Sequence, residues 1–260
     1  MGVACAIIFR DQDRVTMKRF VFFLTLLSFF LPYGSSLAAE GRNMSPIQMQ
    51  IEAEKKARMK NKYAQLVERL YDGDSSAMDL AASLRSYYPY TDGYSAFPDD
   101  LEDEIMALSF AAQDKDPEKA RQALVEYRAF IKAHLGDVDV LYWAIPLARE
   151  DVRYGNPAFL KDIRDRLVNS IFEGHDGLTP DQAPSIVTFG EEALVLARAG
   201  GKVIGKPDLR KNGPQHVNVY DIQDDKTGRL FKFYINVTIP VEKSLQEYEA
   251  QQKDISKFQR

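Results

Sequence analysis

The chain has 260 residues, of which 45% are hydrophobic and 28% are charged, a composition typical of a globular protein with an apolar core. Its 34 Lys and Arg against 38 Asp and Glu give a net charge of −4, which argues against nucleic acid and anionic lipid as partners. The length is enough for one large domain or two small ones.

Residues 1–38 are predicted to be a leader that contains a secretory signal peptide. Met17-Lys18-Arg19 is a basic start, and residues 20–31 are almost entirely apolar. Ser36-Leu37-Ala38 then places small residues where a signal peptidase cuts. The apolar run is shorter than the roughly 20 residues of a membrane span. We therefore expect a periplasmic or secreted protein with a cleaved signal peptide.

Residues 1–16 fit no part of this signal pattern. They are either a gene-start error upstream of Met17 or an elongated leader. The leader holds Cys5, the single cysteine of the chain, so the mature protein is expected to have no disulfide, no thiol chemistry and no lipid anchor. Removing it takes away four of the 34 basic and two of the 38 acidic residues, which leaves a net charge of about −6.

Residues 63–260 are predicted to form a single domain, preceded by a charged helical lead-in at residues 39–62. The helical part covers residues 63–173, where apolar residues recur every three to four positions behind capping side chains. Helices are expected at residues 63–71, 76–87, 101–112, 117–135, 137–148 and 157–171. Pro146 should kink or split the fifth of these helices, because proline removes a backbone donor.

Two of the helices start with an acid or amide followed by proline, Asp116-Pro117 and Asn156-Pro157, 40 residues apart. This spacing is typical of stacked antiparallel helix pairs, as in tetratricopeptide-like arrays. The aromatic and glycine signature of those repeats is not in the sequence, so an irregular helical bundle is the alternative.

Residues 174–260 are predicted to be the α/β part of the domain. Alternating apolar residues predict a strand at 231–239, and the turn at 224–228 joins it to a partner strand that starts near Val217. Further elements are expected as a short strand at 185–189, a helix at 191–199 and a C-terminal helix after Pro240. The fold class is therefore mainly α, with a small antiparallel β element before the last helix.

Three groups of residues share a pattern: Leu84-Arg85-Ser86-Tyr87-Tyr88 with Tyr94 and Phe97, Asp176-Gly177 with Ala183, and Glu191-Glu192. Together they resemble the bacterial domain-of-unknown-function family 4919, over roughly residues 75–240. Ala193 stands where an aromatic residue is expected in that pattern. The family has no assigned function, so the resemblance implies an exported bacterial domain and no catalytic residue.

A cluster of polar residues at His175, Asp176, Glu191 and Glu192 is the first candidate site. Imidazole and carboxylate are the usual protein ligands of zinc, manganese and calcium, so a metal or acid–base site is one interpretation. The other is structural: Asp176-Gly177 is a common turn, and acids at a helix start are favoured by the helix dipole. The structural interpretation is preferred, and no metal or cofactor is predicted.

The aromatic loop of residues 87–97 is the second candidate, with Tyr88, Tyr90, Tyr94 and Phe97 as binding residues. Tyrosines combine apolar area with a hydroxyl at low entropic cost and could hold a peptide or a sugar. The alternative, which is preferred, is that the rings fold back over the helices and close the core.

The leading function is a non-enzymatic periplasmic binding or adaptor protein with a protein or peptide partner. The chain is expected to bind no nucleic acid and to have no membrane anchor once mature. One alternative is a metal-assisted hydrolase that uses His175, Asp176, Glu191 and Glu192. A second is an immunity or inhibitor protein against an exported toxin, which an acidic surface would suit. The sequence leaves the oligomeric state open.

Overall fold

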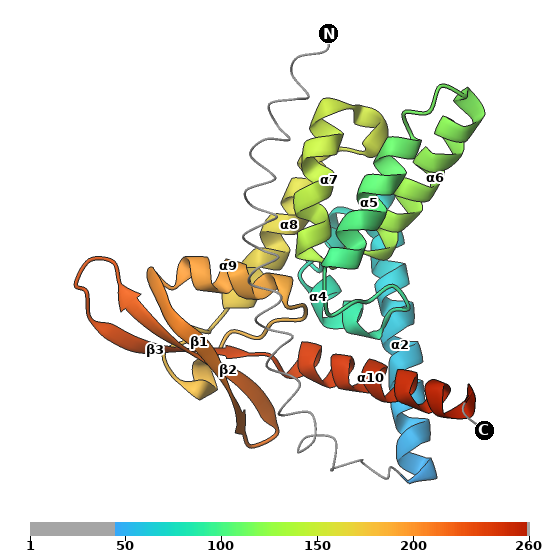
Figure 1. The fold of residues 1–260 in the computed structure, drawn as a ribbon. Helices are drawn as coiled ribbons and strands as arrows, with labels where there is room; N and C mark the ends of the chain where they lie inside the picture. The colour runs from blue at the N-terminus through green and yellow to red at the C-terminus, as the bar shows by residue number, and fades with distance from the viewer. Residues whose placement is uncertain (1–44, 259–260) are drawn as a thin grey trace. The chain divides into compact units, whose positions relative to one another are not determined.

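The computed structural model describes residues 45–258 (Figure 1). The predicted leader, its signal peptide and the first part of the lead-in lie outside the described residues. The chain divides into two units, Met1–Met49 and Gln50–Arg260, and the second contains the whole sheet and nearly all of the helical residues. Within residues 45–258, no helix has both the length and the apolar character that crossing a bilayer requires.

The fold is mainly α, with one three-stranded antiparallel sheet followed by a C-terminal helix. The helices of the described residues are α2 Pro46–Tyr71, α3 Ser75–Met78, α4 Ser83–Tyr87, α5 Asp99–Ala111, α6 Pro117–Ala133, α7 Val138–Glu150, α8 Pro157–Phe172, α9 Gly190–Arg198 and α10 Thr238–Phe258. The strands are β1 Gly201–Asn212, β2 Gln215–Asp224 and β3 Leu230–Asn236. Single 3₁₀ turns lie at η1 Tyr88–Tyr90, η2 Val152–Tyr154 and η3 Pro180–Gln182.

The predicted starts of α6, α7 and α8 are confirmed by their capping hydrogen bonds. The Asp116 carboxylate accepts from the backbone N–H of Glu118 at 3.0 Å. Asp137 accepts in the same way from Asp139 and Val140, and Asn156 from the first turn of α8. Each cap satisfies N–H groups that have no partner inside the helix, so these boundaries depend on local sequence alone.

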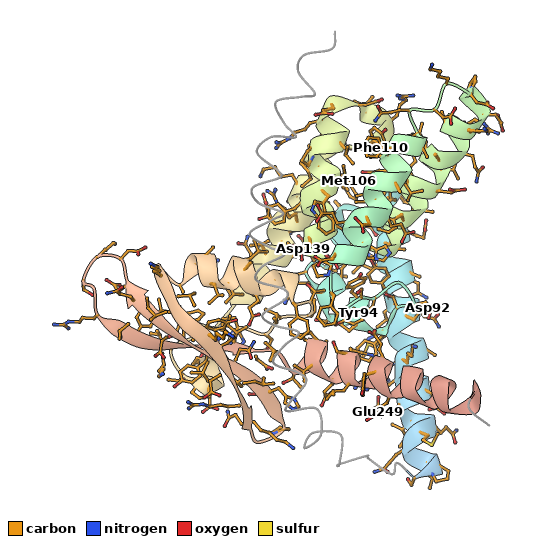
Figure 2. All side chains as sticks on the ribbon, in the orientation of Figure 1. Asp92, Tyr94, Met106, Phe110, Asp139 and Glu249 are labelled. Carbon is orange, nitrogen blue, oxygen red and sulfur yellow. The ribbon has the colours of Figure 1, made fainter. Side chains whose placement is uncertain are left out.

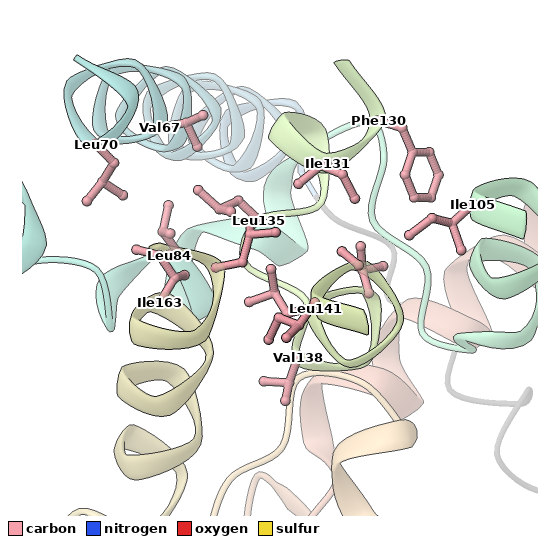
Figure 3. Close-up of a cluster of buried hydrophobic side chains, with 14 of the residues drawn as sticks. Val67, Leu70, Leu84, Ile105, Phe130, Ile131, Leu135, Val138, Leu141 and Ile163 are labelled. Atoms are coloured by element: carbon pink, nitrogen blue, oxygen red, sulfur yellow. The ribbon is translucent and has the colours of Figure 1, made fainter. Parts of the chain in front are cut away.

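The helices enclose one apolar cluster, of which Figure 3 shows a part. On α8, the apolar residues that recur every three to four positions are all buried: Leu160, Ile163, Leu167 and Ile171. On α6, Ala123 and Phe130 are buried, while Leu124 is only half-buried. Leu124 therefore lies at the edge of the cluster, close to the solvent.

One helix prediction was wrong, and a second was wrong in part. The single helix expected at 76–87 is two short helices, α3 and α4, because the backbone between Ala77 and Leu84 closes i→i+3 hydrogen bonds. Pro146 does not split α7, which runs without interruption. Pro146 and Tyr142 are both exposed, so the carbonyl that the proline leaves without a donor lies on the solvent side of the helix.

The sheet has the order β1-β2-β3, and the predicted β2–β3 hairpin with its turn at 224–228 is confirmed. β1 was not predicted. Its register shifts between Ile204 and Asp208, where Gly205 has φ +77° and Pro207 interrupts the alternation. A bulge of this kind removes the period-two pattern by which a strand is recognised.

The short strand predicted at 185–189 is a loop that makes one parallel bridge, Ser185 to Asn236. Together with the preceding residues it covers the outer edge of β3, since Gly177 accepts from the N–H of Tyr234 at 2.8 Å. Gly177 has φ +73°, and a Cβ there would lie 2.5 Å from the ring of Phe233. Only glycine fits this position. The sheet, α9, the last turn of α8 and the first turns of α10 together form a second apolar cluster.

Candidate functional site

The predicted metal or acid–base cluster does not come together in the structure. His175 and Asp176 are exposed, whereas Glu191 and Glu192 are buried. The Asp176 carboxylate accepts from the N–H of Leu178 at 2.9 Å, as expected of a turn residue. Among the described residues, no three His, Cys, Asp or Glu side chains are grouped so that they could hold a metal ion.

Glu191 instead forms a buried, two-pronged ion pair with Arg85. Nε and Nη2 of the arginine donate to the two carboxylate oxygens at 2.8 and 2.7 Å, and the side chains are 8% and 0% exposed. The N–H of Val187 donates to Oε2 at 2.8 Å, and Arg85 also donates to the carbonyl of Ser185. Both oxygens of Glu191 are therefore engaged, and the pair joins α4 to the start of α9.

Glu192 is directed at the sheet. Its carboxylate accepts from the side-chain amide of Asn218 on β2 at 2.7 Å. Burial raises the pKa of Glu192, because the charged form loses its water. The paired glutamates that the sequence places at a helix start thus join α9 to two different parts of the fold.

The aromatic loop turns inward, so Tyr88 and Tyr94 do not form a contact surface. The Tyr88 ring is fully buried, and its hydroxyl lies 2.9 Å from Nδ1 of His134. Tyr94, which lies beside α10 in Figure 2, donates its hydroxyl proton to the carbonyl of Val187 at 2.6 Å. The two rings meet edge to face, with centroids 5.4 Å apart. The preferred interpretation, that these rings close the core, is supported.

Tyr90 and Phe97 lie at the margin of the same loop and are half-buried. The ring of Tyr90 has the ammonium groups of Lys55, on α2, and Lys243, on α10, at 5.4 and 5.3 Å from its centroid. Phe97 stacks on Phe189 with centroids 5.0 Å apart. Both rings are therefore engaged in contacts within the fold.

Sequence reasoning missed a buried polar group around Asp137, which it identified only as a helix cap. One carboxylate oxygen caps α7, and the Tyr88 side chain interacts with the same carboxylate. Burial raises the pKa of Asp137 to about 7. Burial also lowers the pKa of His134 to about 4. No feature of the sequence could have shown this, because both effects come from burial in the tertiary structure.

The buried groups of Arg85, Tyr88, Asp137 and Glu191, which we call the buried junction, connect the aromatic loop, α7 and α9. Coulombic repulsion from Glu191 acts on Asp137 and adds to the effect of burial. The side chains of the junction are at most 8% exposed. A substrate could not reach them without local opening, so the junction holds the fold together and is a poor place for chemistry.

The surface pockets of the described residues include two that differ in their lining. The first, which we call the helix-end pocket, has a volume of about 530 Å³ and lies where the end of α5, the start of α6 and η2 meet. It is lined by Ala112, Gln113, Asp114, Lys115, Pro117, Ala120, Arg121, Leu124 and Arg153. The buried or half-buried members are apolar, and three of the four charged members are basic.

The second pocket, which we call the arginine pocket, has a volume of about 390 Å³ and lies where α8 and α9 end beside the α3–α4 connection. It is lined by Asp79, Ala82, Arg166, Asn169, Ser170, Phe172, Glu173 and Arg198. Its charges balance, with two arginines and two acids, and its lining is mostly polar. The two pockets therefore differ in the ligand chemistry that they suit.

No family model, no curated protein and no solved structure matches this chain. The resemblance to the family of unknown function stays a prediction.

Proposed function

We propose that this chain is an exported, non-enzymatic binding or adaptor protein, and that its helix-end pocket holds an acidic and apolar peptide segment of a protein partner. The observation that carries the proposal is the combination of an apolar floor with a basic rim on a chain that is acidic as a whole. The predicted leader supports export, to the periplasm or the medium.

The floor of the helix-end pocket suits an apolar side chain. Ala112 is buried, Ala120 and Leu124 are half-buried, and Pro117 completes the apolar lining. Removing apolar area from water contributes about 25 cal/mol per Å². Burying one leucine-sized side chain here would therefore contribute up to about 1.5 to 3 kcal/mol to the free energy of binding.

The rim of the helix-end pocket suits a carboxylate. Lys115, Arg121 and Arg153 line it, against Asp114 as the single acid. Arg121 pairs with Glu118 and Arg153 with Asp151, but these arginine side chains are 70% and 55% exposed. Exposed pairs contribute at most about 1 kcal/mol, so a partner's carboxylate can replace Glu118 or Asp151 at little cost.

Exposed apolar side chains lie next to the pocket-lining residues in the sequence. Phe110, labelled in Figure 2, is 59% exposed, Val125 is 52% exposed and Val152 is 79% exposed. Each stands within two positions of a residue that lines the helix-end pocket. Exposed apolar side chains on these elements favour a surface that binds protein over one that binds a free metabolite.

The proposal is tested with a display library of random peptides panned against the purified chain. We expect enriched peptides to carry Asp or Glu beside Leu, Ile or Phe. Arg121→Glu and Arg153→Glu should each weaken binding of a synthesised hit by about tenfold or more, since each reverses a charge in the rim.

Arg210→Glu is the matched control for Arg153→Glu. Arg210 is 56% exposed and pairs with an aspartate two residues earlier, as Arg153 does, but it lies on β1. Binding should be unchanged in this variant. Enrichment of basic or uncharged peptides, or equal loss in Arg210→Glu and Arg153→Glu, would overturn the proposal.

The alternatives from the sequence gain no support from the geometry. A hydrolase built on His175, Asp176, Glu191 and Glu192 would need an open carboxylate, and both oxygens of Glu191 are engaged by Arg85 and Val187. Inhibition of an exported toxin would be one form of the proposed binding role, and it stays a prediction.

We also propose that the helices stack in a tetratricopeptide-like manner, as the pairs α5–α6 and α7–α8. The supporting observation is that α6 and α8 begin with the same device, a capping side chain followed by proline, at Asp116-Pro117 and Asn156-Pro157. The irregular helical bundle is the alternative.

A further inference from the structure

The arginine pocket contains polar groups that the fold itself does not use. Within residues 45–258, the side chains of Asn169, Glu173 and Arg198 make no hydrogen bond or ion pair. Arg166 lies 3.3 Å from Asp162 on its own helix and 3.8 Å from Asp79 across the pocket, which is long for an ion pair. Four charged groups thus face one cavity without neutralising one another at close range.

Two guanidinium groups form the positive side of the arginine pocket. Arg198, in the last turn of α9, lies over the ring of Phe172 at 4.2 Å from its centroid, which restricts the side chain without using its N–H donors. Arg166 comes from α8. A guanidinium presents its donors as a planar fork that matches a carboxylate, so the pair suits a carboxylate ligand.

Asp79 and Glu173 form the negative side. Glu173 is the residue at which α8 ends, and the carbonyl groups at a helix end add partial negative charge. Asp79 ends α3 and is 83% exposed, so it can move to meet a ligand. A small cation such as an ammonium group suits this side, whereas a second carboxylate would be repelled.

The floor of the arginine pocket joins it to the buried junction. Ser170 lines the pocket, and its hydroxyl lies 3.4 Å from Nη1 of Arg85, whose side chain is 8% exposed. The guanidinium of Arg85 is held by Glu191, so the floor is rigid and its charge is balanced. A ligand in the pocket would therefore meet a preformed polar floor.

We propose that the arginine pocket binds a small zwitterion of the α-amino-acid class. Its carboxylate contacts Arg166 and Arg198, and its ammonium contacts Asp79 and Glu173. The volume of about 390 Å³ lies in the range of small-molecule sites, and the balanced charges disfavour a ligand with only one sign. The site is separate from the helix-end pocket and does not rest on the proposed peptide binding.

The test is isothermal titration of the full chain with each of the common amino acids up to about 10 mM, a range that detects weak binding. For an amino acid that binds, the same molecule without its carboxylate, as the amide, and without its ammonium, as the corresponding carboxylic acid, should each bind about tenfold more weakly or worse. Arg166→Gln, Arg198→Gln and Asp79→Asn should weaken binding by a similar factor.

Arg121→Gln is the control, because this arginine lines the other pocket and its side chain is also exposed, at 70% against 38% for Arg166. It should leave amino-acid binding unchanged. Three results would overturn the proposal: no amino acid binds, the carboxylic acid binds as tightly as the amino acid, or Arg166→Gln and Arg198→Gln bind like the unaltered chain. Thermal melts of the variants check that each has folded, and peptide binding at the helix-end pocket is read independently.

Discussion

The buried junction and the arginine pocket use the same residue types in opposite ways. In the junction, Arg85 holds both oxygens of Glu191 at 2.8 and 2.7 Å with almost no solvent contact. In the pocket, Arg166 is 38% exposed and its carboxylate across the cavity is 3.8 Å away. Removing one partner of the buried pair should cost much stability, because the other charge stays out of water. Removing one partner of the exposed pair should cost little, because solvent takes its place. Substitutions in the buried junction should lower the free energy of unfolding more than substitutions in the arginine pocket. Substitutions in the arginine pocket should have the larger effect on ligand binding.

The largest effect is expected for Arg85→Met. This change leaves Glu191 buried without its counter-charge, so the free energy of unfolding should fall by about 3 to 5 kcal/mol. Denaturant unfolding measures it, with Arg166→Met as the matched control, expected within about 0.5 kcal/mol of the unaltered chain. The double variant Arg85→Met with Glu191→Met should recover part of the loss. Equal effects of the two single variants would contradict the comparison.

The next effect is a pH dependence that is hidden in the unaltered chain. The pKa of Asp137 rises from 3.8 to about 7 on folding, so its contribution to stability is lost as the pH rises from about 4 to 7. The pKa of His134 falls from 6.5 to about 4, so its contribution is lost as the pH falls from about 6.5 to 4. Between these limits, the folded chain holds a proton on Asp137 and the unfolded chain on His134, and the two slopes cancel.

Asp137→Asn removes one of the two slopes. The amide keeps an oxygen to cap α7 but does not titrate, so relative to the unaltered chain the variant should gain on the order of 4 kcal/mol between about pH 4 and 7. Unfolding in denaturant at several pH values measures this difference. A difference between the two chains that stays constant over this range would show that Asp137 titrates in the folded state as it does in water.

A smaller effect is expected for Tyr94→Phe. It removes the hydrogen bond to the carbonyl of Val187 but keeps the ring, so the free energy of unfolding should fall by about 1 kcal/mol. Tyr248→Phe is the control, because Tyr248 is 55% exposed, and it should change nothing measurable. An unchanged melting temperature for Tyr94→Phe would mean that the aromatic loop is less firmly attached than its contacts indicate.

The smallest effect is expected for His175→Ala. The side chain is exposed, so its removal should change the free energy of unfolding by less than about 0.5 kcal/mol. Thermal melts with and without added zinc measure it. A clear rise in melting temperature with zinc in the unaltered chain, lost in His175→Ala, would revive the metal site.

The sequence predicted elements that depend on neighbouring residues. Asp116 and Asn156 cap their helices as expected, and the β2–β3 hairpin forms at its predicted turn. The prediction failed where individual residues interrupt the periodic pattern of an element, and where the tertiary structure differs from what the local sequence favours. Pro207 and Gly205 hid β1, and the helix expected at 76–87 is broken by tight turns. For the candidate sites, the sequence predicted that Asp176 is a turn residue, but it did not predict that Glu191 forms a buried ion pair with Arg85.

What the sequence by itself determined is therefore local: helix caps, helix periodicity and the hairpin turn. Each of these depends on residues within a few positions of one another, where backbone sterics and hydrogen bonding decide the outcome. The tertiary structure alone decided which charged side chains form buried ion pairs and which lie at the surface. Arg85 and Glu191 are 106 positions apart, and only packing brings them together and removes their water. The same packing places Arg166 and Arg198 in the lining of one surface cavity.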